Sequence, residues 1–267
     1  MIKTVVIGAA GRMGRRLVAN IAESSTLELV GAVEYDGCPS LGADAGILAG
    51  VGELGVTIGA DLAAAVRGAD AVINFATAGV LEATRTAVDA GCAVVIGTTA
   101  LPPEVKTELR AMADSGARIV SSYNMSVGVN LLFKLVREAA EVLGEGYDVE
   151  IVEMHHNQKK DAPSGTAVRL AEVVCEARGW DYDADVRHGR QGVVGVRTGH
   201  EIGMHSLRGG DVVGDHTVIF AVNGERIELT HKASSRDTFA KGALRAVEFL
   251  QTAAPGLYDM QDVLGLK

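Results

Sequence analysis

Short aliphatic runs alternate with longer stretches of helical spacing from Ile2 to Ser122. The runs lie at Lys3 to Ile7, Glu28 to Val33, Ala71 to Phe75, Ala93 to Ile96 and Arg118 to Ser121. Apolar residues recur with helical spacing at Met13 to Glu23, Leu62 to Arg67, Val80 to Ala90 and Glu104 to Ser115. This alternation is typical of a parallel sheet whose strands are joined by crossover helices. We therefore predict a doubly wound, Rossmann-like α/β domain.

The pattern changes after about Val127. A helix is predicted at Val129 to Leu143, and apolar and polar residues then alternate with period two through Asp148 to His155. Further strands are predicted at Ile202 to Leu207, His216 to Val222 and Arg226 to Thr230, the last two separated by the hairpin signal Asn223-Gly224-Glu225. Such closely spaced strands predict an α+β domain with a mainly antiparallel sheet.

The tail from about Arg236 to Gln251 returns to helical periodicity and is expected to pack back on the first domain. We therefore predict one domain from residues 1–126 with 236–267 and a second from residues 127–235. The polar segment Gly179 to Gly192, which contains Trp180, is predicted to be an exposed loop.

Composition limits the classes of function that fit this chain. Hydrophobic residues make up 48% of the 267 residues, with 22% charged, which is the balance of a folded globular protein. The net charge of -9 (25 basic minus 34 acidic) disfavours a nucleic acid or an anionic membrane as the main partner. Cys38, Cys92 and Cys175 lie far apart, so neither a disulfide framework nor a zinc site is indicated. With no signal peptide or membrane span in the sequence, we expect a cytoplasmic protein.

A glycine-rich turn joins the first strand to the first helix. Gly8, Gly11 and Gly14 would let the backbone approach a pyrophosphate at the helix N-terminus, although the GxxGxxG spacing alone is a weak signal. Glu34 ends the next strand, where an acidic side chain can accept hydrogen bonds from ribose hydroxyls. Together these features predict a dinucleotide site. The alternative is an α/β domain without a ligand, whose glycines serve packing only.

The residues around Glu34 also bear on which nicotinamide is used. Glu34 would repel a 2′-phosphate, and Tyr35 follows it instead of an arginine that could bind that group. Arg12 could still reach a 2′-phosphate from the turn. We therefore expect NADH to be favoured and NADPH to be tolerated. Gly97-Thr98-Thr99 follows the fourth predicted strand and should lie at the same sheet edge, or form only a tight turn.

The stretch from Glu153 to Ala167 contains two histidines and two lysines, and it is predicted to run from a strand through a loop into a helix. Ser164 is a natural N-cap, so the backbone N–H groups of Gly165 and Thr166 are available to a carboxylate. A histidine or a lysine beside a bound anion can donate a proton near neutral pH. Each residue also has a structural interpretation: one histidine of the pair could be structural, Lys160 a surface charge, and Ser164 only a cap.

This loop and several other segments resemble the dihydrodipicolinate reductase family, also called 4-hydroxy-tetrahydrodipicolinate reductase. The resemblance is carried by His155-His156-x-x-Lys159-x-Asp161-Ala162-Pro163-Ser164-Gly165-Thr166-Ala167, by Gly8 to Gly14, Gly97-Thr98-Thr99, Asn124 to Asn130, Gly214-Asp215-His216-Thr217 and His231 to Arg236. It covers essentially the whole chain, and the loop signature is long and specific.

The resemblance implies a role for individual residues. His155 would be the proton donor or acceptor and Lys159 the second catalytic group. His156 and the backbone of Gly165 and Thr166 would bind the substrate carboxylates. The cofactor would be held by Gly8, Ala9, Ala10, Gly11, Arg12, Met13, Glu34, Gly97, Thr98, Thr99, Ser122, Tyr123, Asn124 and Met125. Tyr35, where members that bind NADPH well often carry arginine, and Met125, which replaces a frequent phenylalanine, depart from the pattern.

The resemblance also implies a reaction and an assembly. The substrate would be the cyclic dicarboxylate (2S,4S)-4-hydroxy-2,3,4,5-tetrahydrodipicolinate, which loses water and accepts hydride from NADH or NADPH, without a metal, in lysine biosynthesis through diaminopimelate. The second domain would bind this substrate and build a homotetramer. Two alternatives remain at this point: another two-domain amino-acid or imine dehydrogenase, and a module that senses a dinucleotide without turnover.

Overall fold

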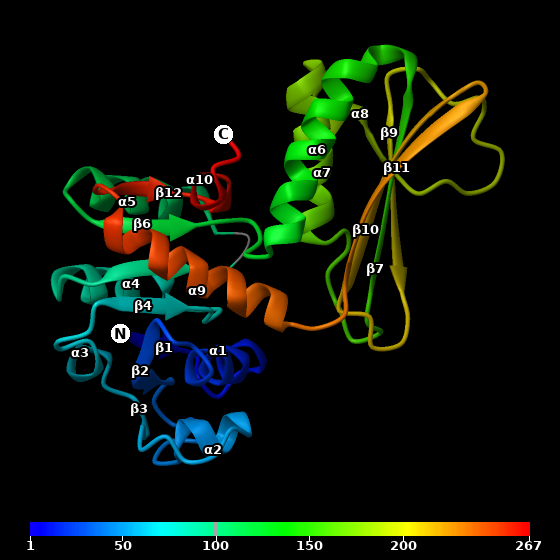
Figure 1. The fold of residues 1–267 in the computed structure, drawn as a ribbon. Helices are drawn as coiled ribbons and strands as arrows, with labels where there is room; N and C mark the ends of the chain where they lie inside the picture. The colour runs from blue at the N-terminus through cyan, green and yellow to red at the C-terminus, as the bar shows by residue number, and fades with distance from the viewer. Residues whose placement is uncertain (99–100) are drawn as a thin grey trace. The chain divides into compact units, whose positions relative to one another are not determined.

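The protein is described by a computed structural model over residues 1–98 and 101–267. Thr99, one of the residues expected to bind the cofactor, lies outside the described residues. Contacts divide the chain into two compact units, Met1–Val127 with Arg236–Lys267 and Gly128–Ser235. Figure 1 shows that the orange and red C-terminal segment belongs with the blue to green elements of the first unit.

One parallel sheet forms the centre of the first unit. Among its described residues, seven strands follow the order β12-β6-β5-β4-β1-β2-β3. The strands are β1 (Ile2–Ile7), β2 (Leu27–Val33), β3 (Ile58–Gly59), β4 (Ala71–Asn74), β5 (Ala93–Ile96), β6 (Arg118–Ser121) and β12 (Gly256–Tyr258). The pairings are parallel from edge to edge. The predicted doubly wound fold is confirmed.

The strand order reverses beside β1, because β1 pairs with β2 on one side and with β4 on the other. The chain therefore runs outward from β1 to β3 and then outward in the other direction from β4 to β6. In open α/β sheets, ligands bind in the crevice beyond the carboxyl ends of the strands at such a reversal. The glycine turn that follows β1 lies at this place.

Helices cover both faces of the parallel sheet. They are α1 (Arg12–Ala22), α2 (Ala45–Ala49), α3 (Leu62–Ala65), α4 (Val80–Asp89), α5 (Pro103–Asp114), α9 (Asp237–Thr252) and α10 (Met260–Leu264). Buried side chains of α1, α2, α9 and α10 share one apolar cluster with the sheet, and those of α4 and α5 share another. Helix α9 therefore completes a core that begins at the N-terminus (Figure 1).

The second unit has a five-stranded sheet over residues 128–235, with the order β11-β10-β7-β9-β8. Its strands are β7 (Asp148–His155), β8 (Val186–His188), β9 (Ile202–Arg208), β10 (Gly214–Val222) and β11 (Glu225–Ala233). Its helical segments are α6 (Val127–Leu143), η1 (Gly144–Gly146), α7 (Gly165–Arg178) and α8 (Tyr182–Asp185). Buried residues of α6 and α7 form one core with the sheet.

The predicted α+β domain is confirmed, and its sheet is mixed, with antiparallel pairs on one side of β7 and parallel pairs on the other. Strand β10 runs antiparallel to both β7 and β11, but β7 with β9 and β8 with β9 are parallel pairs. The physical reason is that two connections return the chain to its original direction: α7 with α8 between β7 and β8, and residues 189–201 between β8 and β9. The hairpin is confirmed: Val222 pairs with Glu225, and Gly224 has φ of 100° in the two-residue turn.

The segment from Gly179 to Gly192 differs from the predicted loop, because it contains α8 and β8 and the buried side chain of Trp180. Residues 189–200 are largely exposed, but Trp180 is buried and belongs to the core of the second unit. Its indole ring also lies 4.9 Å from the guanidinium carbon of Arg178. The polarity of the neighbouring residues concealed this one buried side chain. Within the described part of the chain, helices are too short or too polar to cross a membrane.

Candidate active site

The glycine turn after β1 depends on glycine at two positions, Gly8 and Gly14. Gly8 has φ of 77°, a left-handed conformation that glycine adopts without strain. A Cβ atom on Gly14 would lie 2.0 Å from the carbonyl oxygen of Gly8, so α1 can approach the turn only if residue 14 is glycine. Helix α1 begins after Gly11 with no side-chain cap. Its first N–H groups therefore suit an anion.

Glu34 lies directly after β2, at the same edge of the sheet as the glycine turn. Its Oε1 atom accepts a hydrogen bond of 2.8 Å from the backbone N–H of Ala10. The carboxylate is thereby fixed beside the turn, as expected for a group that accepts hydrogen bonds from a ribose. Arg12 and Tyr35 are both exposed beside it.

The remaining residues expected to bind the cofactor follow β5 and β6. A Cβ atom on Gly97 would lie 2.1 Å from the ring of Phe75, so this turn also requires glycine. The hydroxyl of Thr98 donates to the carbonyl of Ala76 at 2.6 Å. The N–H of Ser126 donates to the side chain of Asn124 at 2.8 Å.

Helix α9 holds the chain at the end of this segment. Met125 is buried, and a Cβ atom on Gly242 of α9 would lie 1.8 Å from the Met125 carbonyl oxygen. Thr98, Ser122 and Tyr123 line a cavity of about 620 Å³ beside α5. Apart from Thr99, the residues predicted to bind the cofactor thus lie along the carboxyl edge of one parallel sheet.

In the second unit, His155 ends β7 with its imidazole held by a carboxylate. Its Nδ1 atom lies 2.6 Å from Oε2 of Glu153, a side chain with no solvent exposure. Arg208 of β9 contacts the same carboxylate, with Nη1 at 2.9 Å from Oε2 and Nη2 at 3.0 Å from Oε1. The backbone N–H of Ser164 adds a hydrogen bond of 3.2 Å to Oε1.

These partners keep Glu153 ionised. Burial by itself would raise the pKa of Glu153, but hydrogen bonds from His155, Arg208 and Ser206 outweigh burial and lower that pKa to about 2. A full negative charge therefore lies against the imidazole of His155 at neutral pH.

The loop between β7 and α7 carries the predicted lysine. Lys159 is partly buried, and its Nζ atom lies 2.7 Å from Oδ2 of Asp161. Its neighbour Lys160 is exposed, as predicted. Arg208 reaches this loop as well, because its Nη2 atom donates to the carbonyl of Asp161 at 2.7 Å.

Helix α7 begins as its sequence predicts. Ser164 is the N-cap, and its Oγ atom accepts from the N–H of Ala167 at 3.2 Å. Gly165 and Thr166 form the first turn, before the earliest intrahelical bond from Val168 N–H to the Ser164 carbonyl. The N–H groups of a helix's first turn point out of its N-terminal end. His156 follows β7 on the other side of the chain from His155, and its N–H donates to the Val212 carbonyl at 2.7 Å.

A second histidine packs against His155. The ring of His216 in β10 meets it edge to face, with centroids 5.2 Å apart. Nε2 of His216 lies 2.9 Å from the Ser164 hydroxyl, and only 3% of the residue is exposed. Burial lowers the pKa of His216 to about 3, and the charge of His155 acts in the same direction. His216 is therefore neutral at physiological pH.

Sequence reasoning assigned no role to Glu153, Arg208 or His216. A signal for Glu153 existed, because Val149, Ile151, Glu153 and His155 form the buried row of β7. A carboxylate that continues an apolar row requires a partner. That partner, Arg208, is 55 residues away in the sequence and could not be identified from β7 alone.

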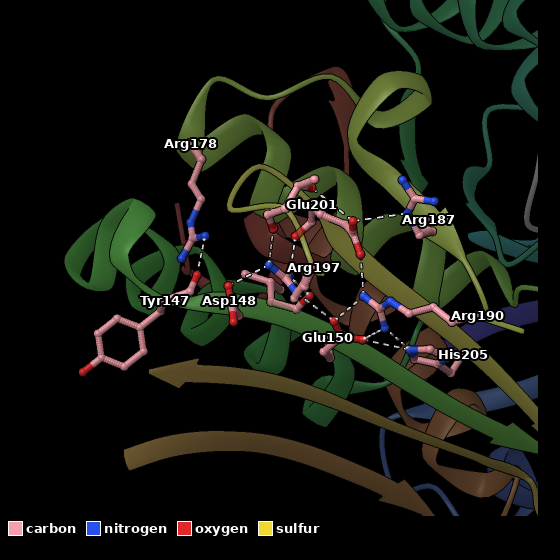
Figure 2. Close-up of polar contacts among 11 residues, drawn as sticks. Tyr147, Asp148, Glu150, Arg178, Arg187, Arg190, Arg197, Glu201 and His205 are labelled. Carbon is pink, nitrogen blue, oxygen red and sulfur yellow. Dashed lines mark hydrogen bonds and ion pairs between the residues drawn. The ribbon is translucent and has the colours of Figure 1, made fainter. Parts of the chain in front are cut away.

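A larger charged cluster lies elsewhere on the same sheet. Figure 2 shows Arg190 between Glu150 and Glu201, with Nη2 distances of 2.7 and 2.5 Å to their carboxylates. His205 contacts Glu150 at 2.8 Å, and Arg197 joins Glu150 from the exposed loop. This cluster ties the loop over residues 189–200 to β7 and β9. Among the described residues, no group of three or more histidine, cysteine or acidic side chains could hold a metal ion.

Family models match both units of the chain. The model described as "Dihydrodipicolinate reductase, N-terminus" matches residues 2–125, and "Dihydrodipicolinate reductase, C-terminus" matches residues 128–264. Curated proteins named 4-hydroxy-tetrahydrodipicolinate reductase match over the whole length. The protein of Syntrophotalea carbinolica is 52% identical over 268 residues, covering 100% of both chains. That of Anaeromyxobacter dehalogenans is 53% identical over 269 residues, covering 100% of this chain and 99% of the relative.

Solved structures share the fold. A dipicolinate-bound dihydrodipicolinate reductase from Paenisporosarcina sp. TG-14 superposes with a TM-score of 0.76 at 24% identity over 98% of both chains. An amine dehydrogenase from Mycobacterium smegmatis superposes with a TM-score of 0.61 at 15% identity, over 96% of this chain and 94% of that one. The fold is thus common to several dehydrogenases, while the full-length sequence matches are specific. This chain belongs to the dihydrodipicolinate reductase family.

Proposed function

We propose that this chain uses NADH or NADPH to reduce (2S,4S)-4-hydroxy-2,3,4,5-tetrahydrodipicolinate to (S)-2,3,4,5-tetrahydrodipicolinate with loss of water, in lysine biosynthesis. One observation carries the proposal: His155, Lys159 and the first turn of α7 gather at the end of β7. A proton donor and an anion-binding helix start are what a reductase of a cyclic dicarboxylate requires. The curated relatives that carry this activity in their names are about 50% identical over the full chain.

The first unit would bind the dinucleotide. A pyrophosphate would fit at the start of α1, where Gly14 packs closely against Gly8 and the helix has no side-chain cap. The carboxylate of Glu34 would accept hydrogen bonds from the ribose. Gly97, Thr98 and the residues from Ser122 to Met125 would hold the remainder of the cofactor at the same sheet edge. The bound nicotinamide would supply the hydride. Because Glu34 repels a 2′-phosphate and Tyr35 offers it no positive charge, NADH would be preferred.

The second unit would bind the substrate and manage its protons. The first backbone N–H groups of α7, at Gly165 and Thr166, would bind one carboxylate, with His156 beside it. After water leaves, hydride at the ring C4 carbon puts negative charge on the conjugated imine. His155 would return a proton to the ring, and Lys159 would stabilise the charge as a nearby cation. One hydride and one proton enter the ring and one water molecule leaves.

Assembly and location complete the proposal. A homotetramer built through the second unit is supported by the family resemblance and by exposed apolar residues on its sheet, among them Ile227 of β11 and Leu207 of β9. The cytoplasm suits the three buried cysteines, which are free thiols.

The test is a coupled assay in which dihydrodipicolinate synthase forms the substrate in place and nicotinamide absorbance reports consumption of NADH or NADPH. Consumption that depends on the synthase supports the proposal. A folded protein that binds NADH but consumes neither cofactor contradicts it. Activity with another imine would then indicate a different dehydrogenase, and inactivity with every imine a dinucleotide sensor.

A lysine pair supplies the matched variants for this assay. Lys159→Ala should lower kcat by roughly 100-fold or more, the range for loss of a group that stabilises charge in the transition state. Lys160→Ala, which removes an exposed neighbour of the same type, should leave kcat unchanged. Fluorescence titration should show unaltered NADH binding in both variants. Near-normal turnover by Lys159→Ala would remove that residue from the mechanism.

A further inference from the structure

A buried carboxylate lies directly behind the proposed proton donor. Glu153 and His155 are two residues apart on β7 and occupy the same buried face. Glu153 has no solvent exposure, whereas the side chain of His155 keeps 11% of its surface exposed. The carboxylate therefore contacts the imidazole from the interior and cannot itself meet solvent.

The carboxylate of Glu153 is held in one orientation by hydrogen bonds to both of its oxygens. Oε2 lies within hydrogen-bond distance of His155 Nδ1 and accepts from Arg208 Nη1. Oε1 accepts from Arg208 Nη2 and from the Ser164 N–H. All of these partners are donors or can act as donors, so the carboxylate is the acceptor for each of them. The bidentate contact with the guanidinium fixes the plane of the carboxylate.

This arrangement determines which nitrogen of His155 carries the proton. An ionised acceptor at Nδ1 requires a proton on that atom, so Nε2 is the nitrogen that exchanges protons with a ligand. Nε2 lies over Gly214 of β10, where a Cβ atom would be 3.0 Å away. Glycine at position 214 leaves room for the imidazole in this orientation.

We propose that Glu153, clamped by Arg208, is a positioning residue that fixes the Nδ1–H tautomer of His155 and stabilises its imidazolium form. The inference rests on the proposed function of His155 and deepens it. Arg208 also connects Glu153 to the loop between β7 and α7. Its Nη2 atom donates both to Glu153 and to the carbonyl of Asp161. Asp161 in turn pairs with Lys159. One guanidinium thus orders both residues that are proposed to be catalytic, His155 and Lys159.

The other ionisable groups around His155 leave Glu153 as its counter-charge. His216 faces it from β10 and is neutral, since burial lowers the pKa of His216 to about 3. His231 of β11 lies behind His216, and burial also lowers its pKa. Lys159 brings positive charge from the loop and pairs with Asp161, whereas Arg208 of β9 shares the Glu153 carboxylate with His155.

The first arm of the test observes His155 without any turnover. Heteronuclear NMR of the imidazole nitrogens in the whole, ligand-free protein should find the neutral ring protonated at Nδ1, with His155→Asn identifying the signals. Glu153→Gln should abolish this single tautomer, because an amide cannot accept from all the donors that meet the carboxylate. Glu201→Gln is the matched control, since Glu201 is also a buried carboxylate and pairs with Arg190 instead of His155.

The second arm measures kinetics. Glu153→Gln should lower kcat about 10- to 100-fold, comparable to loss of the outer partner of a metal-bound histidine, with KM changed far less. The basic limb of the kcat–pH profile should move to lower pH, because the imidazolium loses its counter-charge. Glu153→Asp should restore part of kcat and return the limb toward its original position, which a purely structural role would not do.

The outcomes separate the two proposals. An Nε2–H tautomer in the unaltered protein, or a Glu153→Gln variant that matches Glu201→Gln in NMR and pH profile, overturns the positioning role. Absence of turnover by the unaltered protein overturns the proposed function, while the NMR arm still decides the role of Glu153. Should Glu153→Gln fail to fold, Arg208→Lys keeps the charge but loses the bidentate contact, and the same tautomer measurement applies.

Discussion

Glu34 illustrates how a single side chain can serve both the fold and a ligand. Its carboxylate already accepts the Ala10 N–H, so the glycine turn and β2 are held together without a cofactor. A carboxylate oxygen can accept more than one hydrogen bond, and Glu34 therefore remains able to accept a ribose hydroxyl. The same negative charge repels a phosphate at the 2′ position.

A substitution at Glu34 should accordingly change how the two cofactors are used. Glu34→Ala is expected to raise the apparent KM for NADH about tenfold, the size of one lost charge-assisted hydrogen bond, and to raise that for NADPH less or not at all. Steady-state kinetics with each cofactor measures the difference. Glu28→Ala, an exposed glutamate at the start of the same strand, is the control. An equal rise for both cofactors would contradict the charge argument.

At the level of single residues, the sequence predicted those properties that depend on neighbours in the chain. Ser164 caps α7 and Lys160 is exposed, because both properties depend on neighbours in the chain. Glu153, Arg208 and His216 were not assigned, because their roles arise from contacts between strands that the sequence does not align. Arg208 belongs to β9, and only the parallel pairing of β7 with β9, in which Arg208 lies opposite His155, brings its side chain to Glu153.

Among the elements, α1 depends on the space that Gly14 leaves. A Cβ atom at this position would meet the Gly8 carbonyl oxygen at 2.0 Å, so the helix would have to move away from the turn. Gly14→Ala should therefore cost several kcal/mol of unfolding free energy and weaken NADH binding, because overpacked backbone contacts cannot relax cheaply.

Gly59→Ala in β3 provides the comparison, because a Cβ atom there meets nothing within 4 Å and φ is not positive. Denaturant unfolding and NADH titration of both variants should show a large effect for Gly14→Ala and a small one for Gly59→Ala. Similar stabilities of the two variants would mean that α1 tolerates the displacement.

The long strands and helices were predictable because each buries a periodic apolar face of its own. The strands predicted for the first unit agree with β1, β2, β4, β5 and β6 to within one residue at each end. Strands β3 and β12 have only two and three residues, and their pairing with β2 and β6 defines them. The mixed character of the second sheet likewise follows from the connections before β8 and before β9, and not from any strand's own sequence.

For the whole molecule, acid stability should reflect the buried histidine. The unfolded chain takes up a proton at His216 near its ordinary value of 6.5, whereas the folded protein resists protonation until about pH 3. Stability from this residue is therefore complete above pH 6.5 and is lost as the pH falls toward 3. The contributions of Glu150 and Glu153, whose pKa values are about 2, begin to be lost only near pH 4.5.

Between these values the slope comes from buried histidines, chiefly His216, with a contribution in the same direction from His231. Between about pH 6.5 and 5, the unfolding free energy should fall with a slope approaching about 1.4 kcal/mol per pH unit from His216 alone. His216→Gln should show a shallower slope in denaturant unfolding over this range. His188→Gln, which replaces an exposed histidine of β8, should keep the slope of the unaltered protein. Parallel slopes for both variants would contradict neutral burial of His216.

The interruption of the first unit by the second has a consequence for synthesis on the ribosome. Residues 1–127 emerge first but lack α9, which supplies buried residues to the same apolar cluster as α1. The continuous segment 128–235 has its complete core as soon as it leaves the exit tunnel. The segment made second is therefore able to finish folding before the one made first, and until residues 236–267 follow, the nascent first unit exposes apolar surface that chaperones recognise.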